Sequence, residues 1–293
     1  MKSAIRTVGV AGAGGTMGAG IAIVAARSGF RTVAYDLAPE SLERARRQTE
    51  GFLEKSTERG KLTREQLERI LADLTPTTEL AHVAACDLVI EAVFEDLSVK
   101  QELLKALHEV CPEHTIFASN TSTLSITEIA SGCGREDRVV GMHFCLPAQL
   151  MKLIELSPGM NTSEATFEAA FAWCEAAGQQ PVRTADRPGF ILNALLVPFN
   201  NDVIRAVEAG VAAPADIDKA IRTGLGYKMG PLELLDLIGL DTQLRLCDAI
   251  YPATLDPRAA ASPLLRRMVA AGHLGRKAGR GFYRYEGSSM YGG

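Results

Sequence analysis

The first half of the chain alternates short apolar runs with longer helical patterns. Runs typical of buried strands occupy residues 7–11, 31–36, 86–93, 115–119 and 139–144, with later ones at 153–156 and ending at Val182. Helical patterns lie between them at 19–28, 40–72 with a break near Gly60, 98–111 and 164–177. Strands that alternate with helices in this way predict a parallel sheet with helices on both faces.

The pattern changes at residues 184–189, because no strand pattern appears beyond them. The segment 190–197 is helical and nearly all apolar, Pro198 is expected to kink it, and further helices are expected at 215–225, 231–237 and 241–250. We therefore expect two domains, 1–186 and 187–293: an α/β Rossmann-type doubly wound sheet followed by an all-helical C-terminal domain. The apolar helices predict a homodimer surface, although such helices also build plain domain cores.

Composition limits the possible functions. The 293 residues are 47% hydrophobic and 23% charged, and the net charge of -4 gives no electrostatic basis for binding nucleic acid. The six cysteines form no Cys-x-x-Cys pair, so we expect reduced thiols in a cytoplasmic protein rather than disulfides or a zinc site. No apolar run is long enough to span a membrane, and no signal-peptide pattern is present.

A glycine-rich turn separates the first strand from the first helix. Its residues run from Gly12 to Gly18, and the second strand ends on Asp36. Glycines let a backbone approach a pyrophosphate at a helix N-terminus, and an acid at this spacing bonds the adenosine ribose. This pattern predicts NAD rather than NADP, because a carboxylate would repel a 2'-phosphate. The glycine spacing fits two interpretations: a turn with one extra residue that starts at Gly12, or a regular turn whose first glycine is replaced by Ala13.

Two ionisable residues lie in neighbouring apolar segments. His143 and Glu155 are joined by a proline-containing turn, and an ionisable group in an apolar strand is costly to bury unless it is paired. A carboxylate on one ring nitrogen would fix the tautomer and leave the other nitrogen free to move a proton. With a nicotinamide as hydride acceptor, this pair predicts an alcohol dehydrogenase without a metal. A core histidine satisfied by hydrogen bonds is the competing interpretation.

Three other sets of polar residues are candidates for binding. The segment Asn120–Thr123 either caps a helix or forms a substrate shelf at the ligand edge of the sheet. Arg59 and Lys61 belong either to a solvated helix pair with ion pairs or to a contact with a phosphorylated carrier. Asn193, on an apolar helical face, makes either an ordinary core hydrogen bond or a substrate contact.

Six segments together resemble the L-3-hydroxyacyl-CoA dehydrogenase family, and 3-hydroxybutyryl-CoA dehydrogenases in particular. The resemblance covers nearly the whole chain in order and spacing. The segments are Ser119–Ser122, Gly141–Phe144, Met151–Glu155, Pro188–Asn193, Gly230–Leu234 and Gly275–Tyr283.

The resemblance implies roles for individual residues. His143 is implied as the catalytic base and Glu155 as its partner, while Ser122 and Asn193 would hold the reacting oxygen and the thioester end. The reaction implied is the interconversion of 3-hydroxyacyl and 3-oxoacyl thioesters with hydride transfer to NAD. With Gly12 and Asn120 added, the candidate cofactor-binding residues are Gly12, Gly14, Gly15, Thr16, Met17, Gly18, Asp36, Glu95, Lys100, Asn120, Ser122 and Lys277.

One departure from the family pattern leaves the substrate open. Where the family usually has His-Phe-Phe-Asn-Pro, this chain has Cys145 and Leu146 before Pro147, so an amide beside the reacting centre is lost. This variant is similar to enzymes of polyketide extender-unit pathways, which oxidise a glyceryl group on an acyl carrier protein. The substrate would therefore be linked to coenzyme A or to a carrier protein. A non-thioester hydroxy-acid dehydrogenase and a structural dinucleotide-binding protein of the crystallin sort are further alternatives.

Overall fold

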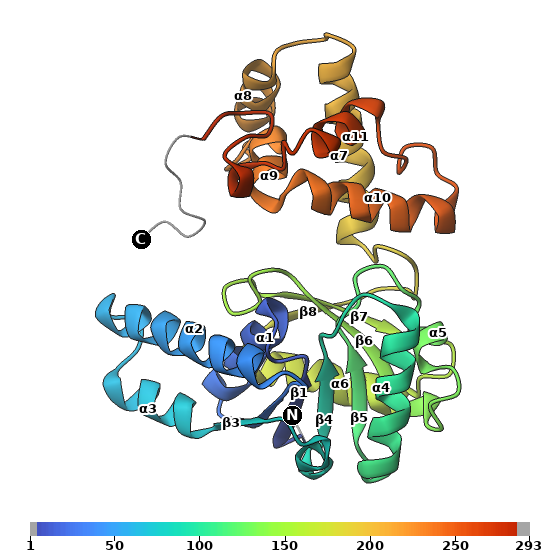
Figure 1. Ribbon diagram of the computed structural model, residues 1–293. Coiled ribbons are helices and arrows are strands. Elements are labelled where there is room, and N and C mark those ends of the chain that lie inside the picture. Colours follow the sequence, from blue (N-terminus) through green and yellow to red (C-terminus); the bar gives the residue numbers. More distant parts are fainter. Residues whose placement is uncertain (1–4, 286–293) are drawn as a thin grey trace. The chain divides into compact units, whose positions relative to one another are not determined.

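The computed structural model describes residues 5–285 and divides the chain into two compact units, one that ends at Arg187 and one that begins at Pro188. The first unit contains all eight strands found in the described residues, in one sheet (Figure 1). Its elements are β1 (Thr7–Ala11), α1 (Thr16–Arg27), β2 (Arg31–Tyr35), α2 (Pro39–Glu58), α3 (Arg64–Ala72), β3 (Leu74–Thr77), β4 (Leu88–Glu91), α4 (Leu97–Val110), β5 (Ile116–Ser119), α5 (Ile126–Ala130), β6 (Val139–Phe144), β7 (Leu153–Pro158), α6 (Glu164–Ala176) and β8 (Gln180–Arg183).

The sheet order is β3-β2-β1-β4-β5-β6-β7-β8. Neighbouring strands are parallel except β6 and β7, which pair antiparallel. The order reverses beside β1, and ligands of doubly wound sheets bind at the carboxyl ends of the strands near such a reversal. This arrangement confirms the predicted Rossmann-type α/β class.

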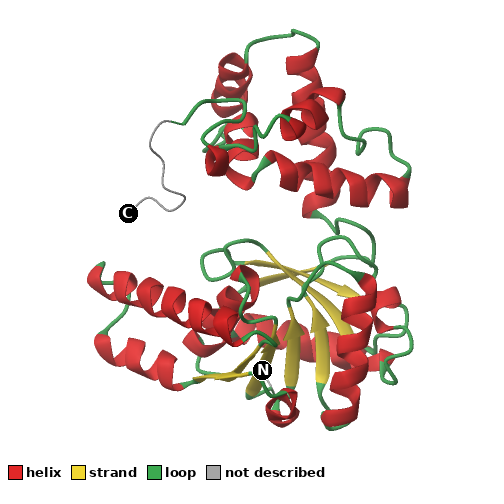
Figure 2. Cartoon of the chain, in the orientation of Figure 1, coloured by secondary structure: helices red, strands yellow, loops and turns green. Residues whose placement is uncertain are grey.

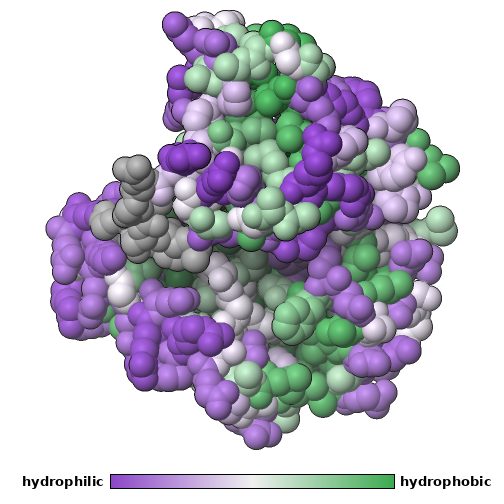
Figure 3. Space-filling model, turned by 45° about the horizontal axis from the view of Figure 1, so that its top comes forward, coloured by the Kyte–Doolittle hydropathy of each residue, from purple (hydrophilic) through white to green (hydrophobic). Residues whose placement is uncertain are grey.

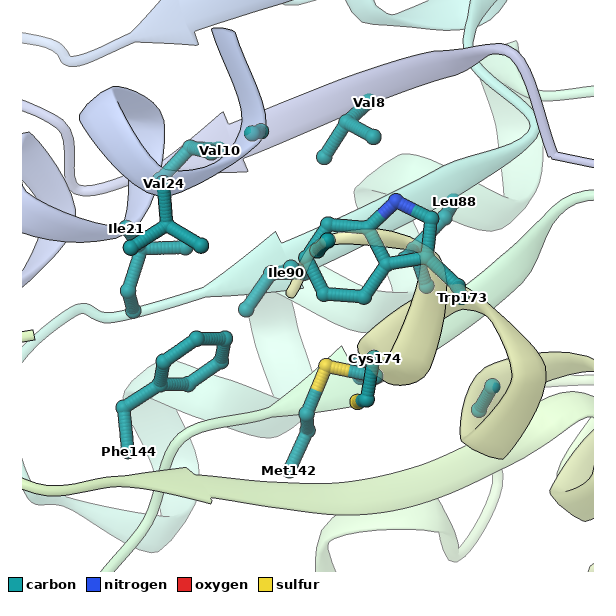
Figure 4. Packing of buried hydrophobic residues seen from close by; sticks show 14 of the residues in the cluster. Val8, Val10, Ile21, Val24, Leu88, Ile90, Met142, Phe144, Trp173 and Cys174 are labelled. Atoms are coloured by element: carbon teal, nitrogen blue, oxygen red, sulfur yellow. The ribbon is translucent and has the colours of Figure 1, made fainter. Parts of the chain in front are cut away.

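Alternation along the strands assigns side chains to the two faces of the sheet. Val8, Val10, Leu88 and Ile90 form one buried cluster with residues of α1 and α6 (Figure 4). Met142 and Phe144 of β6 belong to the same cluster, so His143 between them points to the opposite face. That face is the one covered by α4 and α5 (Figure 1).

The second unit consists of helices (Figure 2). They are α7 (Leu192–Glu208), α8 (Pro214–Leu225), α9 (Pro231–Ile238), α10 (Leu240–Thr254) and α11 (Pro263–Ala270). An apolar core formed mainly by α7, α9 and α10 holds them together, and α7 continues through Pro198. The expected helical second half is confirmed, and among the described residues of this second unit only isolated bridges at 275–284 resemble strand pairing.

One strand and two α-helices are not predicted by the sequence pattern, nor are the short 3-10 helices Leu80–Ala85, Glu136–Arg138 and Arg276–Ala278. β3 is a four-residue edge strand that contains Pro76, and prolines are depleted in strands. α5 and α11 are short helices that begin after the capping residues Ser125 and Ser262. No helix within residues 5–285 is long and apolar enough to cross a membrane.

Trp173 is the largest fully buried side chain, and its ring lies 5.7 Å from that of Phe30. We expect Trp173→Ala to lower the free energy of unfolding by about 3–5 kcal/mol, because the loss of a buried indole leaves a cavity under the sheet. Urea unfolding followed by circular dichroism measures this change. Trp173→Phe should lose clearly less, and equal losses for the two variants would contradict the packing argument.

Candidate active site

The turn between β1 and α1 has a backbone that requires glycine at three positions. Gly12 has a φ of 83°, which side chains rarely adopt, and a Cβ on Gly18 would lie 2.2 Å from the Gly12 carbonyl oxygen. A Cβ on Gly14 would lie 2.6 Å from the Cβ of Ser41, whereas Gly15 has room for one. The required glycines are therefore Gly12, Gly14 and Gly18, which favours the turn with an extra residue over replacement of the first glycine by Ala13.

The N-terminus of α1 is open to an anion. Its capping residue Gly15 supplies no side-chain hydrogen bond, and its first turn holds no acidic residue. Gly15 and Thr16 are exposed and Met17 is half-buried. The free N–H groups and the helix dipole at such an end favour a phosphate group. The narrow glycine turn and this uncapped helix end fit the pyrophosphate of a dinucleotide.

Asp36 follows β2 directly and lies against the glycine turn. Its Oδ2 accepts from the Gly14 N–H at 2.9 Å and its Oδ1 accepts from the Ala38 N–H at 3.0 Å. The carboxylate therefore lies at the carboxyl end of the strand, where the ribose-binding acid of this fold class is found.

His143 and Glu155 face each other directly across the antiparallel pair β6 and β7. The His143 Nδ1 lies 2.8 Å from the Glu155 Oε2, and the two residues are 6% and 1% exposed. A buried carboxylate needs a donor, so the pair places the ring proton on Nδ1. The other ring nitrogen, Nε2, lies 3.1 Å from the Ser122 Oγ, so a line of three polar groups runs from Glu155 to Ser122.

The segment that carries Ser122 is held by Glu95. The Glu95 Oε1 accepts from the N–H groups of Ser122 at 2.8 Å and Thr123 at 3.1 Å, and from the Thr121 hydroxyl at 2.5 Å. Burial favours the neutral form of Glu95, but the charge of Lys100 and the donors of this segment outweigh it and lower the pKa of the carboxyl group. Glu95 is therefore an ionised acceptor that orders the segment.

Two other candidates have structural contacts at this edge of the sheet. The Asn120 Oδ1 accepts from the Phe144 N–H at 2.9 Å and so joins the ends of β5 and β6. Lys100 is 1% exposed, and its Nζ lies 2.9 Å from both carboxylate oxygens of Glu91. Glu91 is not found by the sequence reasoning. The signal that could have found it is a buried strand that ends on an acid, with a lysine in the next helix.

The remaining candidates lie elsewhere. Arg59 and Lys61 are exposed at the turn between α2 and α3, on the left of the first unit, away from β6 and β7 (Figure 1). Hydrophilic side chains gather over that side in Figure 3. Asn193 is half-buried near the start of α7, and Lys277 forms an ion pair with Asp241 at 2.5 Å, both in the second unit. Leu146 is 62% exposed in the turn between β6 and β7.

The fold and this edge of the sheet define a dinucleotide-binding protein with a buried histidine–glutamate pair. Comparison with known proteins gives the particular family. The model of the 3-hydroxyacyl-CoA dehydrogenase NAD binding domain matches residues 7–187, and that of the 3-hydroxyacyl-CoA dehydrogenase C-terminal domain matches residues 189–285. The chain belongs to the 3-hydroxyacyl-CoA dehydrogenase family, and its cofactor is NAD.

Relatives and solved structures agree with this assignment. The chain is 43% identical over 282 residues to a probable 3-hydroxybutyryl-CoA dehydrogenase of Bacillus subtilis (strain 168), covering 96% of this chain and 98% of the relative. It is 43% identical to the mitochondrial hydroxyacyl-coenzyme A dehydrogenase of Rattus norvegicus, covering 97% and 93%. The crystal structure of (S)-3-hydroxybutyryl-CoA dehydrogenase from Ralstonia eutropha matches with a TM-score of 0.93 at 38% identity, covering 97% and 100%.

The glycine turn gives a testable contrast. Gly18→Ala should destabilise the protein without cofactor by about 1–3 kcal/mol, because the new Cβ overlaps the Gly12 carbonyl. It should also weaken NADH binding, since α1 must shift. Thermal unfolding and calorimetric titration with NADH measure the two effects. Gly15→Ala is the control for stability, because its Cβ meets only the Gly12 oxygen at 3.4 Å, and an equal loss of stability there would argue against the contrast.

Proposed function

We propose that this chain is an NAD-dependent 3-hydroxyacyl-CoA dehydrogenase that interconverts short 3-hydroxyacyl and 3-oxoacyl thioesters. The observation that carries the proposal is the buried His143–Glu155 pair. The second ring nitrogen of His143, Nε2, lies within hydrogen-bond distance of the Ser122 hydroxyl at the ligand edge of the sheet. A histidine that only completed a core would not need an ionisable partner on one nitrogen and a hydroxyl on the other. Relatives named as 3-hydroxybutyryl-CoA dehydrogenases support the substrate class.

The proposed mechanism assigns the proton to His143. Its Nε2 accepts the proton of the C3 hydroxyl, and Glu155 on Nδ1 stabilises the resulting imidazolium. The Ser122 hydroxyl, within hydrogen-bond distance of Nε2, orients the reacting oxygen. NAD supplies the acceptor for the hydride that leaves C3. In the reverse direction His143 returns the proton to the oxygen of the 3-oxo group.

The second unit contributes two further residues to the proposal. Asn193 is assigned to the thioester end of the substrate and Lys277 to the cofactor. Family membership supports both assignments.

His143→Gln tests the proposed base. We expect kcat to fall about 10²- to 10⁴-fold, because glutamine keeps a polar side chain of similar size but cannot take up the proton. Oxidation of NADH with acetoacetyl-CoA, followed by absorbance, measures the rate, and thermal unfolding checks the fold. His114→Gln is the matched control, because this histidine of the same unit is exposed, and its kcat should not change. An unchanged kcat in His143→Gln would remove the assignment.

The acyl group of the substrate could be attached to coenzyme A or to an acyl carrier protein, and this choice requires its own test. Leu146, in place of the usual family asparagine, supports a second candidate, oxidation of a 3-hydroxyacyl group bound to an acyl carrier protein. We expect turnover with acetoacetyl-CoA. Assays of the same acyl group on coenzyme A and on a carrier protein, each with NAD(H) and NADP(H), decide between them. Silence with every coenzyme A thioester, together with turnover on the carrier protein, would favour the second candidate.

Arg59 and Lys61 are candidates for binding the carrier, since both acyl carriers are phosphorylated and these side chains are basic. If they contact the carrier, Arg59→Ala with Lys61→Ala should raise the KM for the thioester about 3- to 10-fold and leave kcat unchanged, because uniform binding is lost. An unchanged KM would assign both residues to the solvated turn.

We also propose a homodimer formed through the helical second unit. Large apolar side chains are exposed on these helices, among them Leu195 at 70% and Leu237 at 49%. Large exposed apolar side chains on helices that pack together, as α7 and α9 do, are expected at a subunit interface. Light scattering after gel filtration measures the mass, and a monomer at micromolar concentration would contradict the proposal.

A further inference from the structure

Glu91 is a buried acid at the centre of the ligand edge of the sheet. It is the last residue of β4, is 1% exposed, and pairs in register with Ala11, just before the glycine turn, and with Ser119, just before the polar segment. Its carboxylate accepts from the Ser119 hydroxyl and from the Val93 N–H at 3.1 Å. These contacts place a negative charge under the loops on both sides of the site.

Lys100 neutralises this charge from α4. Its Nζ lies 2.9 Å from each carboxylate oxygen of Glu91, and its side chain is as buried as that of Glu91. The same Nζ lies 3.4 Å from the Glu95 Oε2. The ammonium group is therefore placed between two carboxylates, one buried and one at the edge of the site.

Glu95 connects Lys100 to the polar segment of the site. Its Oε2 faces Lys100, while its Oε1 receives the donors of the segment Thr121–Thr123. Ser122 in that segment has its hydroxyl 3.1 Å from the His143 Nε2. A continuous series of contacts thus runs from Glu91 through Lys100, Glu95 and Ser122 to His143.

A buried ion pair contributes little net stability compared with an apolar pair of the same shape, because desolvation offsets the attraction. The loss of one partner alone is costly, because it leaves an unpaired buried charge. The contribution expected of Glu91 and Lys100 is therefore mainly to fix the position of Glu95 and, through it, the polar segment.

We propose that Glu91 and Lys100 are positioning residues that act through Glu95 to hold Ser122 against His143. The consequence for catalysis rests on the proposed function, whereas the consequence for the segment Thr121–Thr123 does not. Lys100 then has a role different from direct contact with the cofactor, which the resemblance implied for it. If Lys100 contacted the cofactor directly, its removal would weaken NADH binding. If Lys100 is a positioning residue, its removal lowers kcat and reduces the order of the segment Thr121–Thr123.

The test removes the charge pair as a unit. In Glu91→Gln with Lys100→Met, the glutamine oxygen can accept from the Val93 N–H and its NH2 group can donate to the Ser119 hydroxyl oxygen. Methionine replaces the lysine stem, so no unpaired charge is buried. We expect amide hydrogen exchange of residues 119–125 to become about 10-fold faster or more, because Glu95 loses its cation. We also expect kcat with acetoacetyl-CoA to fall about 10-fold or more, with the Kd for NADH within about 3-fold of wild type.

Two comparisons make the result specific. In a Ser122→Ala background, removal of the pair should cause little further loss of kcat, because both changes act on the same contact. Arg135→Met is the control for stability, since Arg135 is another buried cation of this unit, held by three backbone carbonyls near the other end of α4. It should lower the melting temperature and leave kcat and the exchange of residues 119–125 unchanged.

The outcomes separate this inference from the proposed function. A wild-type protein inactive on every thioester would overturn the function, and hydrogen exchange would still decide the positioning role. An active wild type with unchanged exchange in the pair variant would overturn the inference alone. A Kd for NADH that rises as much as kcat falls, or an additive loss in the Ser122→Ala background, would also overturn it.

Discussion

The antiparallel pairing of β6 with β7 is the constraint on which the rest of the first unit depends. All the remaining pairs of neighbouring strands in this sheet are parallel. Two parallel strands can be connected only by a crossover segment, whereas antiparallel strands can be joined by a short turn. The single reversal, closed by the turn around Pro147, brings His143 and Glu155 opposite each other at 2.8 Å. The histidine then points away from the apolar face that Met142 and Phe144 share with α1 and α6, toward the face where polar contacts are available. A buried ionisable pair is placed by backbone hydrogen bonds rather than by flexible side chains.

The two acidic systems at the ligand edge have different surroundings. Glu155 is buried against an imidazole, which can take up a proton and return it. Glu95 is next to a fixed cation and several N–H and hydroxyl donors, and these lower the pKa of its carboxyl group. The first arrangement suits proton transfer, and the second suits a permanent negative charge. Two carboxylates at the same edge of the sheet can therefore have different functions. Glu155 can assist the transfer of a proton, and Glu95 can hold the backbone in one conformation.

Much of this organisation could be predicted from the sequence, because it depends on local patterns. Strand and helix alternation predicted the fold class, and two ionisable residues in adjacent apolar segments predicted that His143 and Glu155 would meet. The register of the glycine turn could not be predicted, since it depends on the approach of Gly18 to the Gly12 carbonyl across the turn. Glu91 was missed, although it ends a buried strand and a lysine follows in the next helix, because its contacts with Lys100 and Ser119 form only through tertiary packing. The edge strand β3 was missed because proline weakens its pattern.

The turn between β6 and β7 has a consequence for the variation that this family of sequences can accept. Side chains alternate faces along a strand, so an insertion or deletion of one residue that shifted β7 in register would turn Glu155 to the other side of the sheet and put Ile154 or Leu156 opposite His143. Substitutions in the turn, such as leucine at position 146, leave that register untouched. The composition of this turn can therefore diverge between relatives without moving Glu155 away from His143, whereas a change of one residue in its length would separate them.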